Sequence, residues 1–222
     1  MGKTIYGFGD SLVDGHCIHI GMLDALAQKY GMEYRKYAVN GAKVIPEQEI
    51  HGKTCESRVP DVAAQIMAAS GEVPDFVVFD GLTNDIYGHG EDIRLGGISC
   101  SYNGVYDSTT FYGAFERICF LLREKYMDSR IFYVCVHKMP TRDMEVQETL
   151  QKAAREVCAK WGIPCVDIFR KGQINTCVEE MRRKYSYDRA ECLTGGNGTH
   201  LNPEGYEKWY LPMLEAAIRP YL

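Results

Sequence analysis

The fold of this chain is decided by residues 74–85, which read PDFVVFDGLTND. Residues 75–79 form the clearest predicted strand, and their nearly continuous apolar character is typical of a strand buried on both faces of a sheet. Polar residues follow at once, ending in Asn84-Asp85. Ligands of parallel α/β sheets bind beyond the carboxyl ends of the strands. The end of this strand is therefore where a functional site is expected.

Strands and helices alternate on both sides of this stretch. We predict further strands at 3–8, 33–39, 131–136 and 163–167, and helices at 16–30, 59–69, 111–126, 143–161, 176–185 and 203–218. Alternation of this kind is typical of βαβ units and a parallel sheet. The predicted fold is an α/β fold, a three-layer α/β/α sandwich with five strands, in a single domain that spans residues 1–222.

A long segment after the third strand has little periodicity. This loop insertion covers about residues 86–109 and is rich in glycine and tyrosine. Loops of such length in a compact domain are usually functional or disordered. Because it leaves directly from Asn84-Asp85, we predict that it lies beside the site and sets its substrate range.

The composition is that of a soluble globular protein, with 45% hydrophobic and 25% charged residues. The formal charge is −5 without a basic cluster, so no nucleic-acid partner is expected. Since no apolar stretch approaches a membrane span and no secretory signal precedes the first strand, we expect no membrane partner and a cytoplasmic location. Nine scattered cysteines without C-x-x-C spacing indicate reduced thiols. No pattern indicates the oligomeric state.

Four short polar motifs follow the predicted strands or lie in the last loop. They are residues 9–11 (Gly-Asp-Ser), 40–41 (Asn-Gly), 84–85 (Asn-Asp) and 197–200 (Asn-Gly-Thr-His). Each alone has an ordinary explanation, such as a helix N-cap, a turn or a surface histidine. The carboxyl ends of parallel strands meet at one edge of a sheet, so the first three motifs should lie together there, while the fourth lies in the last loop before the final helix. In this order and at these positions, the four motifs together are hard to explain separately.

Acyl transfer is the chemistry that these residue types support together. The hydroxyl of Ser11 is a weak nucleophile until a neighbouring imidazole, here His200, removes its proton. The oxyanion that forms needs preorganised donors, which the backbone N–H groups of Ser11 and Gly41 and the side-chain amide of Asn84 would supply. Glycine at position 41 also lets the backbone approach the reacting carbon closely.

These residues resemble the SGNH hydrolase superfamily, also called GDSL lipases or esterases, from residue 4 to about 210. The runs GFGDSLVDG (7–15) and THLNPEGY (199–206) are very similar to those of family members. The resemblance implies a flavodoxin-like fold, with Ser11 as nucleophile, His200 as base, and Gly41 and Asn84 as oxyanion donors. It implies a serine esterase or acylhydrolase that cleaves a small-molecule ester, with O-acetyl groups on carbohydrate as one candidate, without a metal or an organic cofactor.

Two positions depart from the family pattern. Leu82 stands where the third block usually has glycine, and Asn197 stands where the family has an aspartate that orients the catalytic histidine. Three alternatives follow from Asn197. The amide itself orients His200, as in Cys-His-Asn enzymes; Asp188 or Glu191 from the same loop completes a triad; or the chain is a catalytically impaired SGNH-fold binding protein.

Two further signals have simpler interpretations. His16 and His19 lie three residues apart on a predicted helix, but no third ligand stands at supporting spacing, so we interpret them as solvated or packed histidines. Gly7-x-Gly9 lacks the third glycine of a dinucleotide-binding loop, which argues against a nucleotide cofactor.

Overall fold

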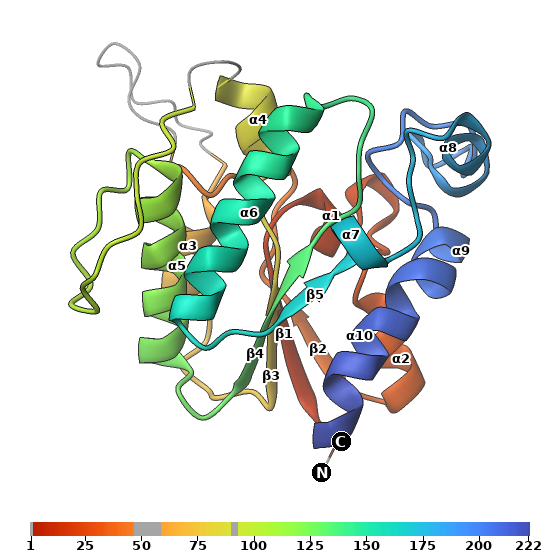
Figure 1. The fold of residues 1–222 in the computed structure, drawn as a ribbon. Coiled ribbons are helices and arrows are strands. Elements are labelled where there is room, and N and C mark those ends of the chain that lie inside the picture. The colour runs from red at the N-terminus through yellow and green to blue at the C-terminus, as the bar shows by residue number, and fades with distance from the viewer. Residues whose placement is uncertain (1, 47–58, 90–92) are drawn as a thin grey trace.

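The centre of the molecule is a sheet of five parallel strands in the order β2-β1-β3-β4-β5 (Figure 1). The computed structural model describes residues 2–46, 59–89 and 93–222. The strands are β1 (Thr4–Phe8), β2 (Glu33–Lys36), β3 (Phe76–Phe79), β4 (Arg130–Cys135) and β5 (Cys165–Asp167). The predicted α/β/α fold with a five-stranded parallel sheet is thus confirmed.

Helices cover both faces of the sheet (Figure 1). One face packs against α3 (Val62–Ala68), α5 (Phe111–Lys125) and α6 (Met144–Lys160), and the other against α2 (Asp24–Tyr30) and α10 (Leu211–Ile218). The remaining helices are short: α1 (Ser11–Asp14), α4 (Thr83–His89), α7 (Ile168–Lys171), α8 (Glu179–Tyr185) and α9 (Pro203–Gly205). A π turn (Tyr206–Tyr210) joins α9 to α10.

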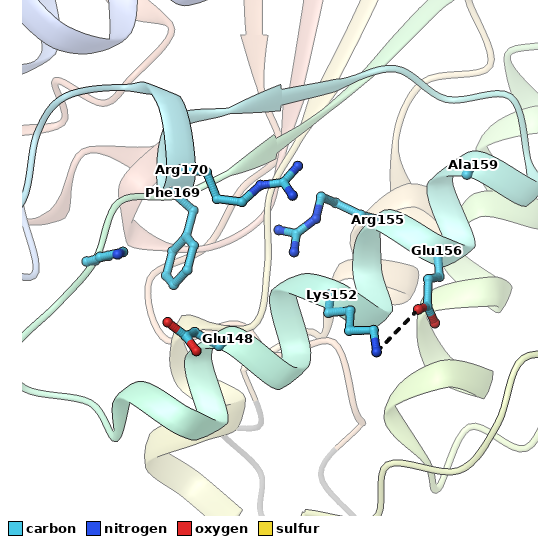
Figure 2. Close-up of a pocket in the computed structure, with 8 residues that line it drawn as sticks. Glu148, Lys152, Arg155, Glu156, Ala159, Phe169 and Arg170 are labelled. Atoms are coloured by element: carbon cyan, nitrogen blue, oxygen red, sulfur yellow. Dashed lines mark ion pairs between the residues drawn. The ribbon is translucent and has the colours of Figure 1, made fainter.

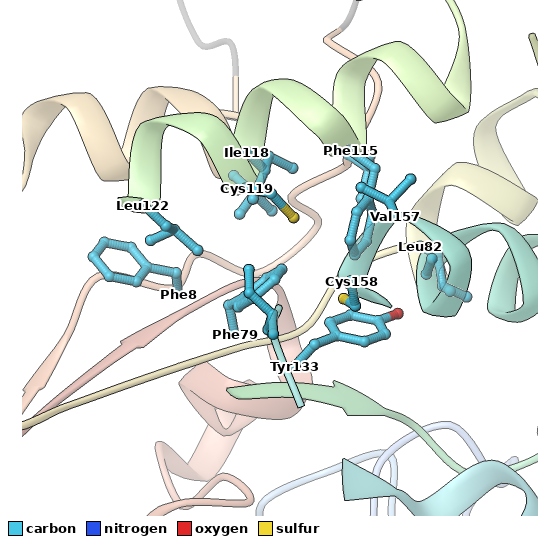
Figure 3. Packing of buried hydrophobic residues seen from close by; sticks show 14 of the residues in the cluster. Phe8, Phe79, Leu82, Phe115, Ile118, Cys119, Leu122, Tyr133, Val157 and Cys158 are labelled. Carbon is cyan, nitrogen blue, oxygen red and sulfur yellow. The ribbon is translucent and has the colours of Figure 1, made fainter. Parts of the chain in front are cut away.

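The alternation of side chains along β3 divides the core in two. Val77 and Phe79 face α5 and α6, whereas Phe76 and Val78 face the layer of α2 and α10. Figure 3 shows the first side, where Phe115 of α5 lies between Phe79 and Tyr133 of neighbouring strands, with ring centroids 5.8 and 5.0 Å away. Fully burying a side chain of this size contributes about 1.5–3 kcal/mol. This packing fixes the helices against the sheet.

The order of the strands reverses between β1 and β3. From β1 the chain continues to β2 on one side, and from β3 it continues to β4 on the other. Ligands of open α/β sheets bind at such a point, outside the carboxyl ends of the strands. Residues 9–11 and 80–85 begin here, as predicted.

The predicted helix over residues 16–30 is wrong in its first half, because only Asp24–Tyr30 is α-helical. Residues 16–18 form a single 3₁₀ turn that follows Gly15, whose φ is +100°. The chain folds back tightly here, since a Cβ on Gly15 would lie 2.2 Å from the nitrogen of Ile20. His16 and His19 also have positive φ. The apolar spacing of the segment therefore reflects a packed turn rather than a helix.

The prediction that residues 86–109 form a loop beside the site includes residues 90–92, which lie outside the described part of the chain, and it is wrong for most of the rest. The helix α4 takes up its first residues, and residues 93–95 run along the start of α5, where Phe111 N–H donates to Arg94 O at 2.9 Å. Residues 99–106 lie against the far end of α6, where the ring of Tyr102 packs edge-on against Trp161. Because α6 starts at the carboxyl ends of the strands and runs back, this end is remote from the site (Figure 1).

A buried ion pair anchors this loop. Lys160, at the end of α6, pairs with Glu116 of α5, whose side chain is 1% exposed. Lys160 Nζ also donates to the carbonyls of Ser99 and Ser101 at 2.8 and 2.6 Å, and Glu116 accepts the Ser99 N–H at 2.9 Å. The two charges thus add to the aromatic contacts that hold the loop against α6.

We expect Lys160→Met to lower the free energy of unfolding by about 3–5 kcal/mol, because it leaves the carboxylate of Glu116 buried without a cation. Lys152→Met is the matched control: Lys152 is 73% exposed and pairs with Glu156 at 4.0 Å, so its loss should cost under about 1 kcal/mol. Chemical denaturation measures both. Equal stabilities of the two variants would contradict a structural role for the buried pair.

Candidate active site

Ser11 lies at the end of β1, as the first residue of α1. The carboxylate of Asp10 caps this helix by accepting the N–H of Leu12 at 2.9 Å. This is the usual role of aspartate at an N-cap. The cap fixes the backbone at Ser11, whose relative exposure is only 6%. The nucleophile proposed from sequence therefore lies on a turn that a capped helix fixes, and it is largely buried.

The turn at residues 9–11 depends on two carboxyl groups, those of Asp10 and Asp80, and both are fully buried. Asp80, at the end of β3, accepts the N–H of Asp10 at 3.0 Å. The approach requires glycine at position 9, because a Cβ there would lie 1.7 Å from Asp80 Oδ1 and φ is +135°. Oδ2 of Asp10 and Oδ2 of Asp80 find no donor among the described residues. Burial raises the pKa of both groups, and the charge of Asp10 raises that of Asp80 further. The pair thus favours holding one proton.

His200 faces Ser11 from the last loop. Its Nε2 lies 2.9 Å from Ser11 Oγ, although 189 positions separate the two residues. The loop is held by the carbonyl of His200, which accepts the N–H of Tyr187 at 3.1 Å. Burial lowers the pKa of His200 to about 3, and the neighbouring His16, His137 and Arg142 lower it further. The imidazole is therefore neutral at physiological pH and able to accept a proton.

The other ring nitrogen of His200 lacks the partner that a triad would give it. Nδ1 is buried and has no hydrogen bond within the described part of the chain. The side-chain oxygen of Asn197 instead accepts the N–H of Thr199 at 2.9 Å, and Asp188 Oδ1 accepts the N–H of Asn197 at 3.0 Å. Asn197, Asp188 and Glu191 all lie near in sequence, yet none of them is hydrogen-bonded to Nδ1. No direct hydrogen bond therefore supports the predicted role of these residues in orienting His200.

The proposed oxyanion donors lie on two segments that are tied together. The turn at residues 39–42 places Gly41 at φ +83°, with the N–H of Ala42 donating to Val39 O at 3.0 Å. Asn84, in the first turn of α4, donates from Nδ2 to Ala42 O at 2.9 Å. One hydrogen of that NH₂ group remains for another acceptor. The structure thus brings Asn84 beside the Gly41 turn.

A buried aspartate secures the chain that follows this turn. Asp85 accepts the N–H groups of Val44 and Ile45 at 2.9 and 2.8 Å. Burial raises the pKa of Asp85 to about 6, against the effect of these two hydrogen bonds. The second residue of the Asn84-Asp85 motif is therefore structural, and it holds the Gly41 segment against α4.

Two histidines that the sequence motifs did not assign to the site are part of it. His16 stacks on His200 with ring centroids 3.8 Å apart and 5° between the planes. His137, at the end of β4, is fully buried, and its Nε2 lies 3.0 Å from the carbonyl of Gly198. Since a carbonyl only accepts, Nε2 of His137 carries the proton and the hydroxyl of Tyr210 donates to Nδ1 at 2.7 Å. Burial lowers the pKa of His137 to about 4, so it stays neutral.

His137 is a single histidine after an apolar strand and belongs to no motif, so the sequence does not indicate that it is part of the site. His16 does have a signal: it follows Ser11 by five positions, directly after Gly15. A glycine in the left-handed region redirects the chain, and the residue after it can return toward the helix start. Both histidines act on the loop that carries His200.

A groove of about 700 Å³ lies between α6 and α7, and none of the predicted site residues lines it (Figure 2). Arg155 of α6 and Arg170 of α7 point toward one another across it. Arg170 pairs with Asp167 at 2.5 Å, and Lys138 lies over the ring of Phe169 at 5.4 Å. This groove is separate from the Ser11–His200 pair.

Possible metal ligands, cysteines and membrane-spanning helices were the other features of interest in the described residues. Within residues 2–46, 59–89 and 93–222, no group of three His, Cys, Asp or Glu side chains is arranged to hold a metal ion. Eight of the nine cysteines lie in this part of the chain and are free thiols, with Cys119, Cys135 and Cys158 buried. No helix in these ranges is long and apolar enough to cross a membrane.

Comparison with known proteins gives one family and many related folds. Residues 8–208 match the GDSL-like lipase/acylhydrolase family. No curated protein sequence matches the chain. Among solved structures, a protein from Lactobacillus plantarum superposes with a TM-score of 0.75 at 18% sequence identity, covering 100% of this chain and 98% of that chain.

Two further structures carry functional names. The lipase/acylhydrolase from Enterococcus faecalis has a TM-score of 0.59 at 17% identity, covering 98% of this chain and 96% of its own. An active-site mutant of a family two carbohydrate esterase from Clostridium thermocellum has a TM-score of 0.62 at 15% identity, covering 99% of this chain and 64% of its own. At these identities the likeness is one of fold.

The buried carboxyl pair predicts a specific pH dependence of stability. Because the pKa of Asp80 is higher in the folded than in the unfolded chain, its contribution is present below the unfolded pKa and is lost as pH rises through the folded pKa. Asp80→Asn keeps an oxygen for the Asp10 N–H and replaces the proton with an NH₂ group. We therefore expect its melting temperature to fall less than that of wild type as pH rises toward 9.

Asp75→Asn is the control with the opposite sign. Lys3, at 2.8 Å, lowers the pKa of Asp75, so this carboxylate stabilises the fold above its unfolded pKa and ceases to do so as pH falls. Its substitution should cost stability at pH 7 and little in acid. If Asp80→Asn and wild type lose stability in parallel between pH 5 and 9, Asp80 does not hold a proton.

Proposed function

The chain belongs to the GDSL-like lipase/acylhydrolase family, and we propose that it is a serine esterase in which Ser11 attacks a small ester and His200 accepts its proton. The observation that carries this proposal is the 2.9 Å contact between Ser11 Oγ and His200 Nε2. Nucleophile and base within hydrogen-bond reach are the signature of an activated serine. The neutral state of His200 suits it to the role of base.

The reaction proceeds in two steps on these residues. Ser11 Oγ bonds to the carbonyl carbon while its proton passes to His200 Nε2, and the carbonyl oxygen becomes an oxyanion. The N–H groups of Ser11 and Gly41 and the free hydrogen of the Asn84 amide receive that charge. When the tetrahedral intermediate collapses, the C–O bond to the alcohol breaks and His200 returns the proton to the departing oxygen. Water, activated by His200, then releases the acid from Ser11.

The substrate class that we propose is an O-acetyl ester of a carbohydrate. Ser11 is only 6% exposed, and a short acyl group needs the least room around such a nucleophile. The fold likeness to a family two carbohydrate esterase supports a sugar as the alcohol. Acetate release from an acetylated oligosaccharide should exceed hydrolysis of p-nitrophenyl octanoate; the reverse preference would contradict this choice of substrate.

A second candidate is a binding protein with an impaired site. It is favoured by the buried Nδ1 of His200, which has no hydrogen bond in the described ranges, and by the amide at Asn197 in place of a carboxylate. A serine whose base is not oriented by a further group would bind an ester without cleaving it.

Labelling with a fluorophosphonate probe separates the two candidates. We expect the wild-type protein to be labelled and to hydrolyse p-nitrophenyl acetate, and Ser11→Ala to lose both by more than about 10³-fold, since the nucleophile is removed. Ser70→Ala controls for a serine outside the site. A folded wild-type protein that the probe leaves unmodified would favour the binding protein.

Asn197→Asp tests how much catalytic activity is lost by having an amide instead of a carboxylate at position 197. A carboxylate at position 197 can keep one oxygen on the Thr199 N–H and offer the other to His200, so it stabilises the imidazolium. We expect kcat to rise at least about 10-fold, toward the ~10⁴-fold that separates aspartate from asparagine in a serine protease. The carboxylate also raises the pKa of His200 from about 3. Because only the neutral imidazole accepts a proton, the acid limb of kcat/KM should move to higher pH.

Asn197→Ser is the matched control, since it keeps an acceptor for Thr199 N–H without a charge. It should change neither the acid limb nor kcat by as much as Asn197→Asp does. A kcat for Asn197→Asp equal to or below that of wild type would mean that another group already orients His200.

A further inference from the structure

The imidazole of His16 lies flat against that of His200. The ring centroids are 3.8 Å apart and the planes differ by 5°, while Nδ1 of His200 is buried without a hydrogen bond among the described residues. Hydrogen bonding therefore constrains this ring at one point in its plane, the contact of Nε2 with Ser11 Oγ. Beyond that hydrogen bond, the plane of the His200 ring is fixed by the stacking of His16 on its face.

The backbone holds His16 in this place at some cost. Gly15 has φ +100° and His16 has φ +46°, both in the left-handed region. A residue other than glycine is uncommon there, and such strain is concentrated at functional sites. The ring itself is held by Nε2, which lies 3.3 Å from the carbonyl of Asp188, so Nε2 carries the proton in the neutral ring.

Asp188 connects the stacked ring to the loop of the base. Its carbonyl accepts from His16, and its carboxylate accepts the N–H of Asn197 at 3.0 Å. The ring of Tyr187 also packs near His16, with centroids 5.9 Å apart. A single short segment thus sets the position of both rings of the stack.

We propose that His16 is a positioning residue: by stacking on the face of His200 it orients the base, as a carboxylate at position 197 would orient it from the edge of the ring. When Ser11 Oγ bonds to the acyl carbon, its proton moves to Nε2 of His200 and that ring becomes a cation. The stacked His16 ring fixes the plane of the base while the proton moves to Nε2 and then on to the leaving alcohol. The inference rests on the proposed esterase function.

Two substitutions at position 16 separate the ring from the backbone. His16→Phe keeps a flat ring but strains a left-handed position, whereas His16→Asn removes the ring and suits that backbone, since asparagine tolerates it best after glycine. We expect His16→Asn to lower kcat about 10- to 100-fold with KM within about 2-fold, and His16→Phe to stay within about 3-fold of wild type. The same pattern should appear in fluorophosphonate labelling rates.

His19→Asn is the control, because His19 also has positive φ in the same turn, and its side chain is 76% exposed. It should leave kcat unchanged. A wild-type kcat in His16→Asn, or a loss that appears only in KM, would overturn the proposal. So would a loss in His16→Phe with none in His16→Asn, because activity would then follow the backbone.

The double variant with Asn197→Asp gives a readout that a merely structural residue would not move. If His16 substitutes for the missing carboxylate, His16→Asn should cost less than about 3-fold in kcat once Asp stands at position 197. An equal cost in both backgrounds overturns the proposal, even if every His16 variant is impaired. Melting temperatures confirm that each variant is folded.

The failure of this inference differs from failure of the proposed function. A wild-type protein that is not labelled and does not hydrolyse esters refutes the esterase function itself. Labelling of the wild type together with an unaffected His16→Asn refutes only the role of His16.

Discussion

The contact between Gly9 and Asp80 holds together the ends of β1 and β3, where the order of the sheet reverses. Asp80 can reach the N–H of Asp10 only because position 9 carries no side chain. Asp10 in turn caps α1, and the first residue of that helix is Ser11. A side chain at position 9 would separate the two strand ends and displace the nucleophile from His200. The geometry of the site therefore starts with a backbone contact rather than with the reacting groups.

The rest of the site consists of loops that are tied to this edge by buried polar contacts. Asp85 fixes the segment that follows Gly41, and His137 fixes the carbonyl of Gly198 near His200. Each of these bonds lies in the interior, where an unsatisfied partner costs about 1–3 kcal/mol. Loops that would otherwise be mobile are thus held at fixed positions around Ser11. His200 differs from them, because its orientation depends on Ser11 at one atom and on His16 across its face.

The fold and the meeting of Ser11 with Asn84 could be predicted from the sequence for a physical reason, whereas the pairing of Ser11 with His200 followed from the family resemblance. An apolar run such as residues 76–79 must be buried on both faces, and polar motifs after parallel strands must meet at one edge. These two constraints are enough to bring Ser11 and Asn84 to the same edge of the sheet. They also limit the number of arrangements that the remaining motifs can adopt.

What could not be predicted depends on contacts that leave no periodic pattern. The turn after Gly15 has helical spacing of apolar residues, yet left-handed backbone at His16 returns the chain to the site. The loop at 99–106 follows a strand-end motif in sequence, but the buried pair of Lys160 and Glu116 draws it to the other end of α6. Charged residues are rarely buried, so sequence alone gives no reason to place them in such an anchor.

The hydrogen bonds to the carbonyl of Gly198 have a consequence for the chemical stability of Asn197. Asparagine followed by glycine is the dipeptide that deamidates most readily, because the glycine nitrogen can attack the side-chain amide and close a succinimide ring. Here the carbonyl of Gly198 is bound by both His137 and Thr176, at 3.0 and 2.8 Å, and the Asn197 oxygen is held by Thr199. Ring closure needs rotation of bonds that these contacts restrict. The same contacts that place His200 for reaction therefore oppose this ring closure at residue 197.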